Sequence, residues 1–132
     1  MAVDDPRQQR VRTFVTRDLE PGEQIEAIVP VVYDGPMWAM YAFGYLSSPL
    51  VKIFAFVLTD RRLLVVRCSP VQSIPVRLRV TVPREQVSLV AFAPRRRSHV
   101  LALDAGGHRY SVTVGPLYAP AAEHFAAQLG GA

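Results

Sequence analysis

The sequence has one cysteine and almost no lysine, and both shortages limit what the protein can be. Cys68 stands alone among 132 residues, which excludes a disulfide framework and any metal site built from several cysteines. All 15 basic residues except Lys52 are arginine, a bias typical of GC-rich coding sequences. The net charge of +4 is therefore weak evidence for a nucleic-acid or membrane partner.

The sequence also lacks the motifs of common enzymes. It contains no Gly-x-Ser-x-Gly, no phosphate-binding loop and no dinucleotide fingerprint. His99, His108 and His124 have no second ligand at metal-binding spacing. We therefore predict that the protein is not an enzyme and has no catalytic residue, no cofactor and no metal. Cys68 is predicted to be a small buried hydrophobe, since nothing near it in sequence would lower its pKa.

No cleavable signal opens the chain, because the segment from Met1 to Gln9 is polar and acidic. We therefore expect a cytoplasmic protein, with peripheral contact to the inner membrane face as the alternative. A length of 132 residues fits one domain. The hydrophobic content of 50% excludes a disordered chain.

What is present is a series of seven strand-like segments. In the clearest of them an apolar side chain occupies every second position, which predicts a half-buried strand with Val76, Leu78, Val80 and Val82 on one face. Gly106-Gly107 predicts a tight hairpin that places Asp104 opposite Arg109. The seven segments are Gln24–Tyr33, Ile53–Thr59, Arg62–Cys68, Val76–Val82, Val87–Phe92, Val100–Asp104 and Arg109–Val114.

Two helices are expected to flank these strands. The first covers Pro6 to Glu20, and the second begins near Pro120. The strands follow one another through short turns with no crossover helix, which predicts an antiparallel meander. We therefore expect a mainly β fold, a seven-stranded, partly open barrel or sandwich with a capping C-terminal helix and an extra N-terminal helix.

Three local patterns resemble the bacterial PH-like and GRAM-like domains of the pleckstrin-homology superfold. They lie at Leu19–Glu23, Val57–Val65 and Val82–Val90. The resemblance implies a partly open barrel, a non-catalytic role and frequent self-association. It divides the chain into an N-terminal helical extension, 1–20, and a PH-like domain, 21–132, with an apolar insertion at 35–52. Lipid-binding members of the superfold carry a basic cluster on the first hairpin, and here only Lys52 is basic.

The insertion is the least usual part of the chain. From Met37 to Leu58 the only charged residue is Lys52. Three interpretations stay open: a membrane-spanning helix, a loop that covers the core, or an exposed apolar patch that binds something. Gly44 and Pro49 interrupt the segment, and Met37–Leu46 alone is too short to cross a bilayer.

These observations predict a binding module that self-associates or docks a protein partner through the apolar 37–46 loop. The alternative is a peripheral membrane module that inserts this aromatic loop beside basic residues at anionic lipid. A nucleic-acid partner is not expected, because no aromatic residues interleave with the arginines of the densest basic cluster. The predicted interaction residues are Met37, Trp38, Tyr41, Phe43, Tyr45, Lys52, Arg61, Arg62, Arg95, Arg96 and Arg97.

Overall fold

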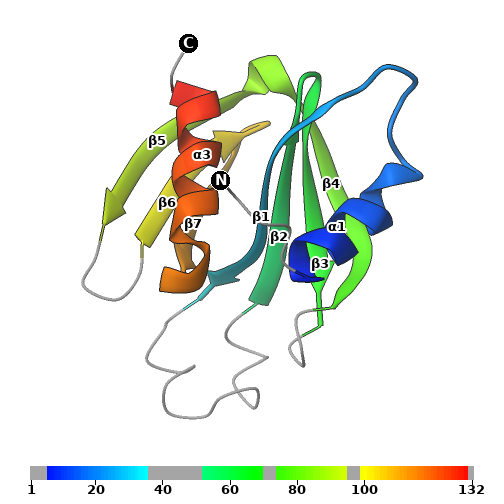
Figure 1. The fold of residues 1–132 in the computed structure, drawn as a ribbon. Helices are drawn as coiled ribbons and strands as arrows, with labels where there is room; N and C mark the ends of the chain where they lie inside the picture. Colours follow the sequence, from blue (N-terminus) through cyan, green and yellow to red (C-terminus); the bar gives the residue numbers. More distant parts are fainter. Residues whose placement is uncertain (1–5, 36–51, 70–73, 95–98, 131–132) are drawn as a thin grey trace.

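The computed structural model describes residues 6–35, 52–69, 74–94 and 99–130 (Figure 1). Each of the seven predicted strands is present, with bounds within two residues of those expected, and the mainly β class is confirmed. The elements are α1 (Pro6–Thr16), β1 (Ile25–Asp34), β2 (Lys52–Thr59), β3 (Arg62–Cys68), β4 (Pro75–Pro83), the 3-10 turn η2 (Arg84–Gln86), β5 (Val87–Pro94), β6 (His99–Ala105), β7 (His108–Val114), the 3-10 turn η3 (Pro116–Tyr118) and α3 (Ala119–Gly130).

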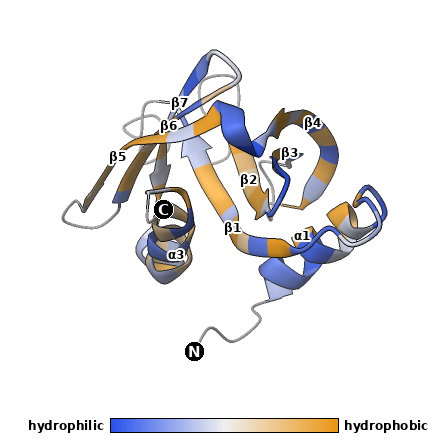
Figure 2. Ribbon diagram, turned by 90° about the horizontal axis from the view of Figure 1, so that it is seen from above, coloured by the Kyte–Doolittle hydropathy of each residue, from blue (hydrophilic) through white to orange (hydrophobic). Residues whose placement is uncertain are grey.

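The seven strands form one antiparallel sheet in the order β4-β3-β2-β1-β7-β6-β5. The sheet curls without closing, so β4 and β5 are its edges among the described residues (Figure 2). Both edges are irregular. β4 begins at Pro75 and ends at Pro83, β5 ends at Pro94, and each edge strand contains a register shift. Proline lacks the N–H that a pairing strand needs, and bulges interrupt the ladder.

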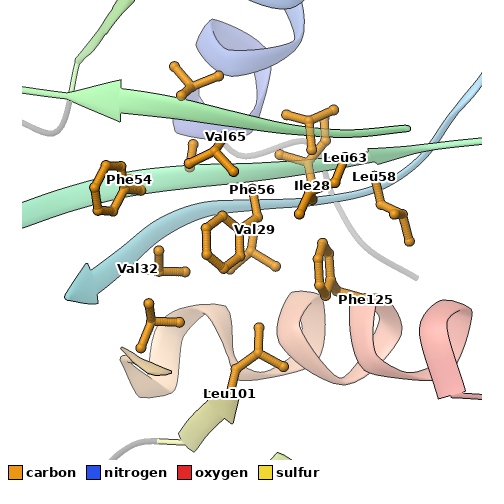
Figure 3. Close-up of a cluster of buried hydrophobic side chains, with 14 of the residues drawn as sticks. Ile28, Val29, Val32, Phe54, Phe56, Leu58, Leu63, Val65, Leu101 and Phe125 are labelled. Atoms are coloured by element: carbon orange, nitrogen blue, oxygen red, sulfur yellow. The ribbon is translucent and has the colours of Figure 1, made fainter. Parts of the chain in front are cut away.

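Strands β1, β2 and β3 are covered on both faces. On what we call the inner face, the ring of Phe56 lies 5.9 Å from that of Phe125 in α3 and 5.7 Å from that of Tyr110 in β7. The outer face is covered by α1, through the buried Val11 and Val15. Figure 3 shows these strands between the two helices. Helix α1 therefore packs on its own sheet.

Helix α1 is shorter than predicted, because it ends at Thr16 and not at Glu20. Beyond it the chain forms local turns, in which the Asp18 and Leu19 N–H groups donate to the carbonyls of Val15 and Thr16. The Glu20 N–H donates to the Glu23 carboxylate at 2.9 Å, and the Arg62 guanidinium donates to the carbonyl of Asp18. The apolar spacing of the segment does not reveal these bonds, of which the one from Arg62 is long-range.

The predicted face of β4 is wrong in its N-terminal half. Val65 pairs with Val80, whereas the next residue of β3, Val66, pairs with Leu78. Val65 and Val66 are neighbours in β3 and point to opposite faces, so their partners Val80 and Leu78 also point to opposite faces. Arg79, which lies between them, is therefore the extra residue of a bulge. Val80 and Val82 lie on the inner face and Leu78 on the outer face, while Val76 is 57% exposed.

Other local predictions are confirmed. Gly106 and Gly107 have φ values of 60° and 88°, the left-handed conformation that a tight primed turn requires. Asp104 pairs with Arg109, with Nε and Oδ1 2.6 Å apart. Cys68 is buried, and burial raises the pKa of its thiol to about 12, so it is no nucleophile at neutral pH.

The packing of α1 can be tested by Val15→Ala. Val15 is fully buried, so removing two methyl groups should lower the free energy of unfolding by about 2 kcal/mol. The control Arg12→Ala changes an exposed residue of the same helix and should shift it by less than about 0.5 kcal/mol. Urea unfolding measures both. Equal, small effects would mean that α1 does not belong to the core.

Candidate functional site

The structure describes three of the predicted interaction residues, and they do not lie together. Lys52 begins β2, whereas Arg61 and Arg62 lie at its other end, in and after the turn to β3. An eight-residue strand spans about 25 Å, so Lys52 cannot share one site with the arginine pair. The remaining predicted residues lie outside the described ones: Met37, Trp38, Tyr41, Phe43, Tyr45, Arg95, Arg96 and Arg97.

Arg62 belongs to a buried polar cluster that it forms with Glu23 and Thr59. Its Nε donates to Glu23 Oε2 at 3.0 Å, and the Glu23 side chain is fully buried. The Thr59 hydroxyl donates to the same carboxylate at 2.6 Å and accepts the Arg62 backbone N–H at 2.9 Å. The cluster joins the segment before β1 to the β2–β3 turn.

This cluster controls the ionisation of Glu23. Burial of the carboxylate raises its pKa, but hydrogen bonds from Arg62, Thr59 and the Glu20 N–H, together with the Arg62 charge, outweigh burial and lower the pKa to about 2. The cluster therefore holds a charged Glu23 at neutral pH. Arg62 therefore has a structural role in this cluster, and its predicted role at an interaction surface stays a prediction.

Two further arginines at this end also form ion pairs. Arg61 Nη1 lies 3.0 Å from Glu20 Oε1, and Arg84 Nη1 lies 2.7 Å from Glu26 Oε1. Arg84 also donates to the carbonyl of Gln128, which ties α3 to the start of β5 through η2. The upper end of Figure 1, where β2 turns into β3, thus holds three glutamate–arginine ion pairs.

The inner face of the sheet borders a cavity of about 560 Å³. Its lining extends from Asp34 and Lys52, at the lower ends of β1 and β2 in Figure 1, to Pro83 and Gln86 near the upper end. Strands β1, β2 and β4 and the β6–β7 turn contribute its walls. Asp34 and Lys52 are cross-strand partners at its rim, and Phe54 continues the same face two residues further along β2. Tyr110 and His108 line the opposite wall from β7.

Four cations lie on or beside this face without an ion pair among the described residues: Lys52, Arg67, Arg77 and Arg79. Arg67 and Arg77 are direct cross-strand partners, a like-charge pairing that is destabilising. The Arg67 guanidinium lies 5.7 Å from the centre of the Phe54 ring, which places it on the inner face. The bulge in β4 turns Arg79 towards the cavity.

Tyr110 is the most buried polar side chain of the cavity wall, with 6% of its surface exposed. Its ring packs edge-on against Phe54 and against His108, at centroid distances of 6.5 and 4.4 Å. Burial raises its pKa, Arg79 opposes this, and Asp34 adds to it. The hydroxyl is neutral at pH 7, and it lies close enough to Arg79 and Asp34 for their charges to shift its pKa. It has no hydrogen-bond partner among the described residues.

This arrangement is suited to binding an anion. It offers two cations, a neutral hydroxyl donor and an aromatic wall in a concave space. The described residues contain no group of three or more potential metal ligands. Within the part of the chain that the structure describes, no helix has the length and apolar character to cross a bilayer.

Comparison of the chain with protein-family models and with curated proteins finds no match. The resemblance to the pleckstrin-homology superfold therefore stays a prediction from the sequence. Of the residues that line the cavity, only Lys52 is a predicted interaction residue, and Arg79 was missed at the sequence level for a physical reason. Arg77 and Arg79 alternate with apolar residues, which indicates a solvated face, and only the bulge brings Arg79 to the inner side.

The lowered pKa of Glu23 predicts acid sensitivity. A carboxyl group with a pKa of about 2 in the fold and 4.5 as its ordinary value stabilises the fold fully above pH 4.5, and this stabilisation is lost as pH falls towards 2. By pH 3 the loss is about 2 kcal/mol. Glu23→Gln should remove this part of the pH dependence and be less stable at pH 7.

Urea unfolding at pH 7 and pH 3 measures the difference. The control is Glu123→Gln, which makes the same charge change on an exposed residue of α3 and should keep the acid-dependent loss. A Glu23→Gln protein that loses as much stability between the two pH values as the wild type would contradict the role of the buried pair.

Proposed function

We propose that this protein is a non-catalytic binding module that attaches peripherally to an anionic membrane surface through the lower end of its sheet. The observation that carries the proposal is the separation of charge. Three glutamates and three arginines neutralise one another at the β2–β3 end. Towards the other end, Lys52, Arg67, Arg77 and Arg79 have no ion pair among the described residues, and Asp34 is the one acid of the cavity.

The sequences of the two segments that follow β1 and β5 support the proposal. The sheet order makes β1 and β5 run in opposite directions along the sheet, but in the curled sheet both strands end on the lower side of Figure 1. The chain between Asp34 and Lys52 contains Trp38, and the chain between β5 and β6 contains Arg95–Arg97. Aromatic side chains with polar tips suit the headgroup region, and each arginine near an anionic surface adds about 1 kcal/mol.

The location that follows from this proposal is the inner face of the cell membrane. We also propose a relationship to the PH-like domains, which rests on the patterns at Leu19–Glu23, Val57–Val65 and Val82–Val90. The basic residues differ from the first-hairpin cluster of lipid-binding members, because three of the four cations come from β3 and β4.

Co-sedimentation with vesicles of phosphatidylcholine, with and without phosphatidylglycerol, tests the proposal. We expect binding only with phosphatidylglycerol, weakening as salt is raised. Lys52→Gln should weaken it about fivefold, the equivalent of one charge near the surface. Arg61→Gln is the matched control at the other end of β2 and should have no effect. Trp38→Ala with Tyr41→Ala should lower binding further by removing the aromatic contact.

Two results would overturn the proposal. One is pelleting that does not depend on the anionic lipid. The other is an equal loss of binding from Arg61→Gln and Lys52→Gln, which would mean that the charge of the whole protein matters and the lower end does not.

Self-association is a second candidate, favoured by an apolar groove between α1 and the start of β4. The groove has a volume of about 420 Å³ and is lined by Phe14, Ile74 and Pro75, with Ile74 42% exposed. Exposed apolar surface of this kind is common at protein interfaces. Light scattering over the micromolar range should then show a dimer that Ile74→Ser disrupts. A monomer at every concentration would remove this candidate.

A further inference from the structure

The cavity on the inner face has features of a specific ligand site, beyond the general attraction of a basic surface. Its volume of about 560 Å³ lies within the range of sites for small molecules. Its polar groups come from separate elements, with Lys52 on β2, Arg79 on β4 and Tyr110 on β7. A membrane surface needs only exposed cations and makes no use of a nearly buried hydroxyl.

The charges define the class of ligand. Lys52 and Arg79 are both without an ion pair among the described residues, and Arg67 and Arg77 add to the positive potential from the same sheet. This excess favours a doubly charged anion over a singly charged one. Arginine and lysine are also the side chains that most often bind phosphate.

The remaining polar groups define the shape of the ligand. Tyr110 is a donor without a partner among the described residues, and Asp34 is a carboxylate on the same cavity wall as Lys52. A bound phosphate can accept from Tyr110, whereas the Asp34 carboxylate needs a donor from the ligand. The ring of Phe54, held under the Arg67 guanidinium, gives the carbon skeleton an apolar surface.

We propose that this cavity binds a small hydroxylated organic phosphomonoester, with the phosphate between Arg79, Lys52 and the Tyr110 hydroxyl and a ligand hydroxyl donating to Asp34. The ligand is either a free metabolite of this kind or the exposed headgroup of a phosphomonoester lipid. The proposal does not require attachment to a membrane. Binding would offset the repulsion between the unpaired cations, so it should also stabilise the fold.

Isothermal titration of the full chain with glycerol 3-phosphate, inorganic phosphate and glycerol tests the proposal. We expect saturable binding of glycerol 3-phosphate, weaker binding of inorganic phosphate and none of glycerol. Tyr110→Phe keeps the packed ring and removes only the hydroxyl, so it should weaken binding about tenfold. Arg79→Gln should weaken it at least as much. Arg61→Gln, the control at the other end of the sheet, should leave it unchanged.

Vesicles distinguish the two sources of the phosphate. If Tyr110→Phe lowers binding to vesicles with phosphatidic acid, a phosphomonoester, but not to those with phosphatidylglycerol, a phosphodiester, the ligand is a lipid headgroup. If the variant affects only the titration with glycerol 3-phosphate, the ligand is a free metabolite. Both results support the cavity as a phosphomonoester site.

The proposal is overturned if glycerol 3-phosphate does not bind, or if Arg61→Gln weakens its binding as much as Arg79→Gln. Circular dichroism of each variant establishes that it is folded, and a folded Tyr110→Phe protein that binds with wild-type affinity would also overturn the proposal. If the titrations fail but phosphatidylglycerol vesicles still bind the protein and Lys52→Gln weakens that binding, the phosphomonoester site is overturned and the proposed membrane attachment stands. If the protein binds glycerol 3-phosphate but does not bind vesicles, only the proposed membrane attachment is overturned.

Discussion

The burial of β2 on both faces is the constraint on which the rest of the structure depends. From Ile53 to Thr59 every residue of this strand is buried, so both sides of the sheet need a cover. Helix α3 and strand β7 cover the inner face, and α1 covers the outer face (Figure 3). An interior of this kind leaves little room for polar chemistry in the middle of the strands. Charged groups therefore gather at the two ends, where the strands turn.

The two ends use their charges in opposite ways. At the β2–β3 end a carboxylate, a hydroxyl and a guanidinium satisfy one another, so Glu23, Thr59 and Arg62 fix the geometry of the turn. Towards the other end the cations lack such partners among the described residues, and two of them, Arg67 and Arg77, face each other directly. Paired charges hold the chain around them in one geometry, whereas unpaired cations on a concave surface are available to a ligand.

Much of the fold could be predicted from the sequence, because β-branched residues and short turns are local signals. The strand bounds and the Gly106-Gly107 hairpin followed from them. The site could not be predicted, because it depends on register. One extra residue at Arg79 changes which side chains of β4 meet the cavity, and no local pattern marks that bulge. The ion pairs of Arg61 with Glu20 and of Arg62 with Glu23 could not be predicted either, because they join residues about 40 positions apart in the sequence.

The proline-bounded, bulged edges of the sheet have a consequence for how this chain can aggregate. Its interior strands are rich in valine and leucine, the composition that forms intermolecular β-structure when it is exposed. Neither β4 nor β5 presents a regular edge on which another chain could extend the sheet. Molecules in the native state are thus poor templates for one another. Aggregation should begin from opened molecules, at a rate that follows the population of the unfolded state.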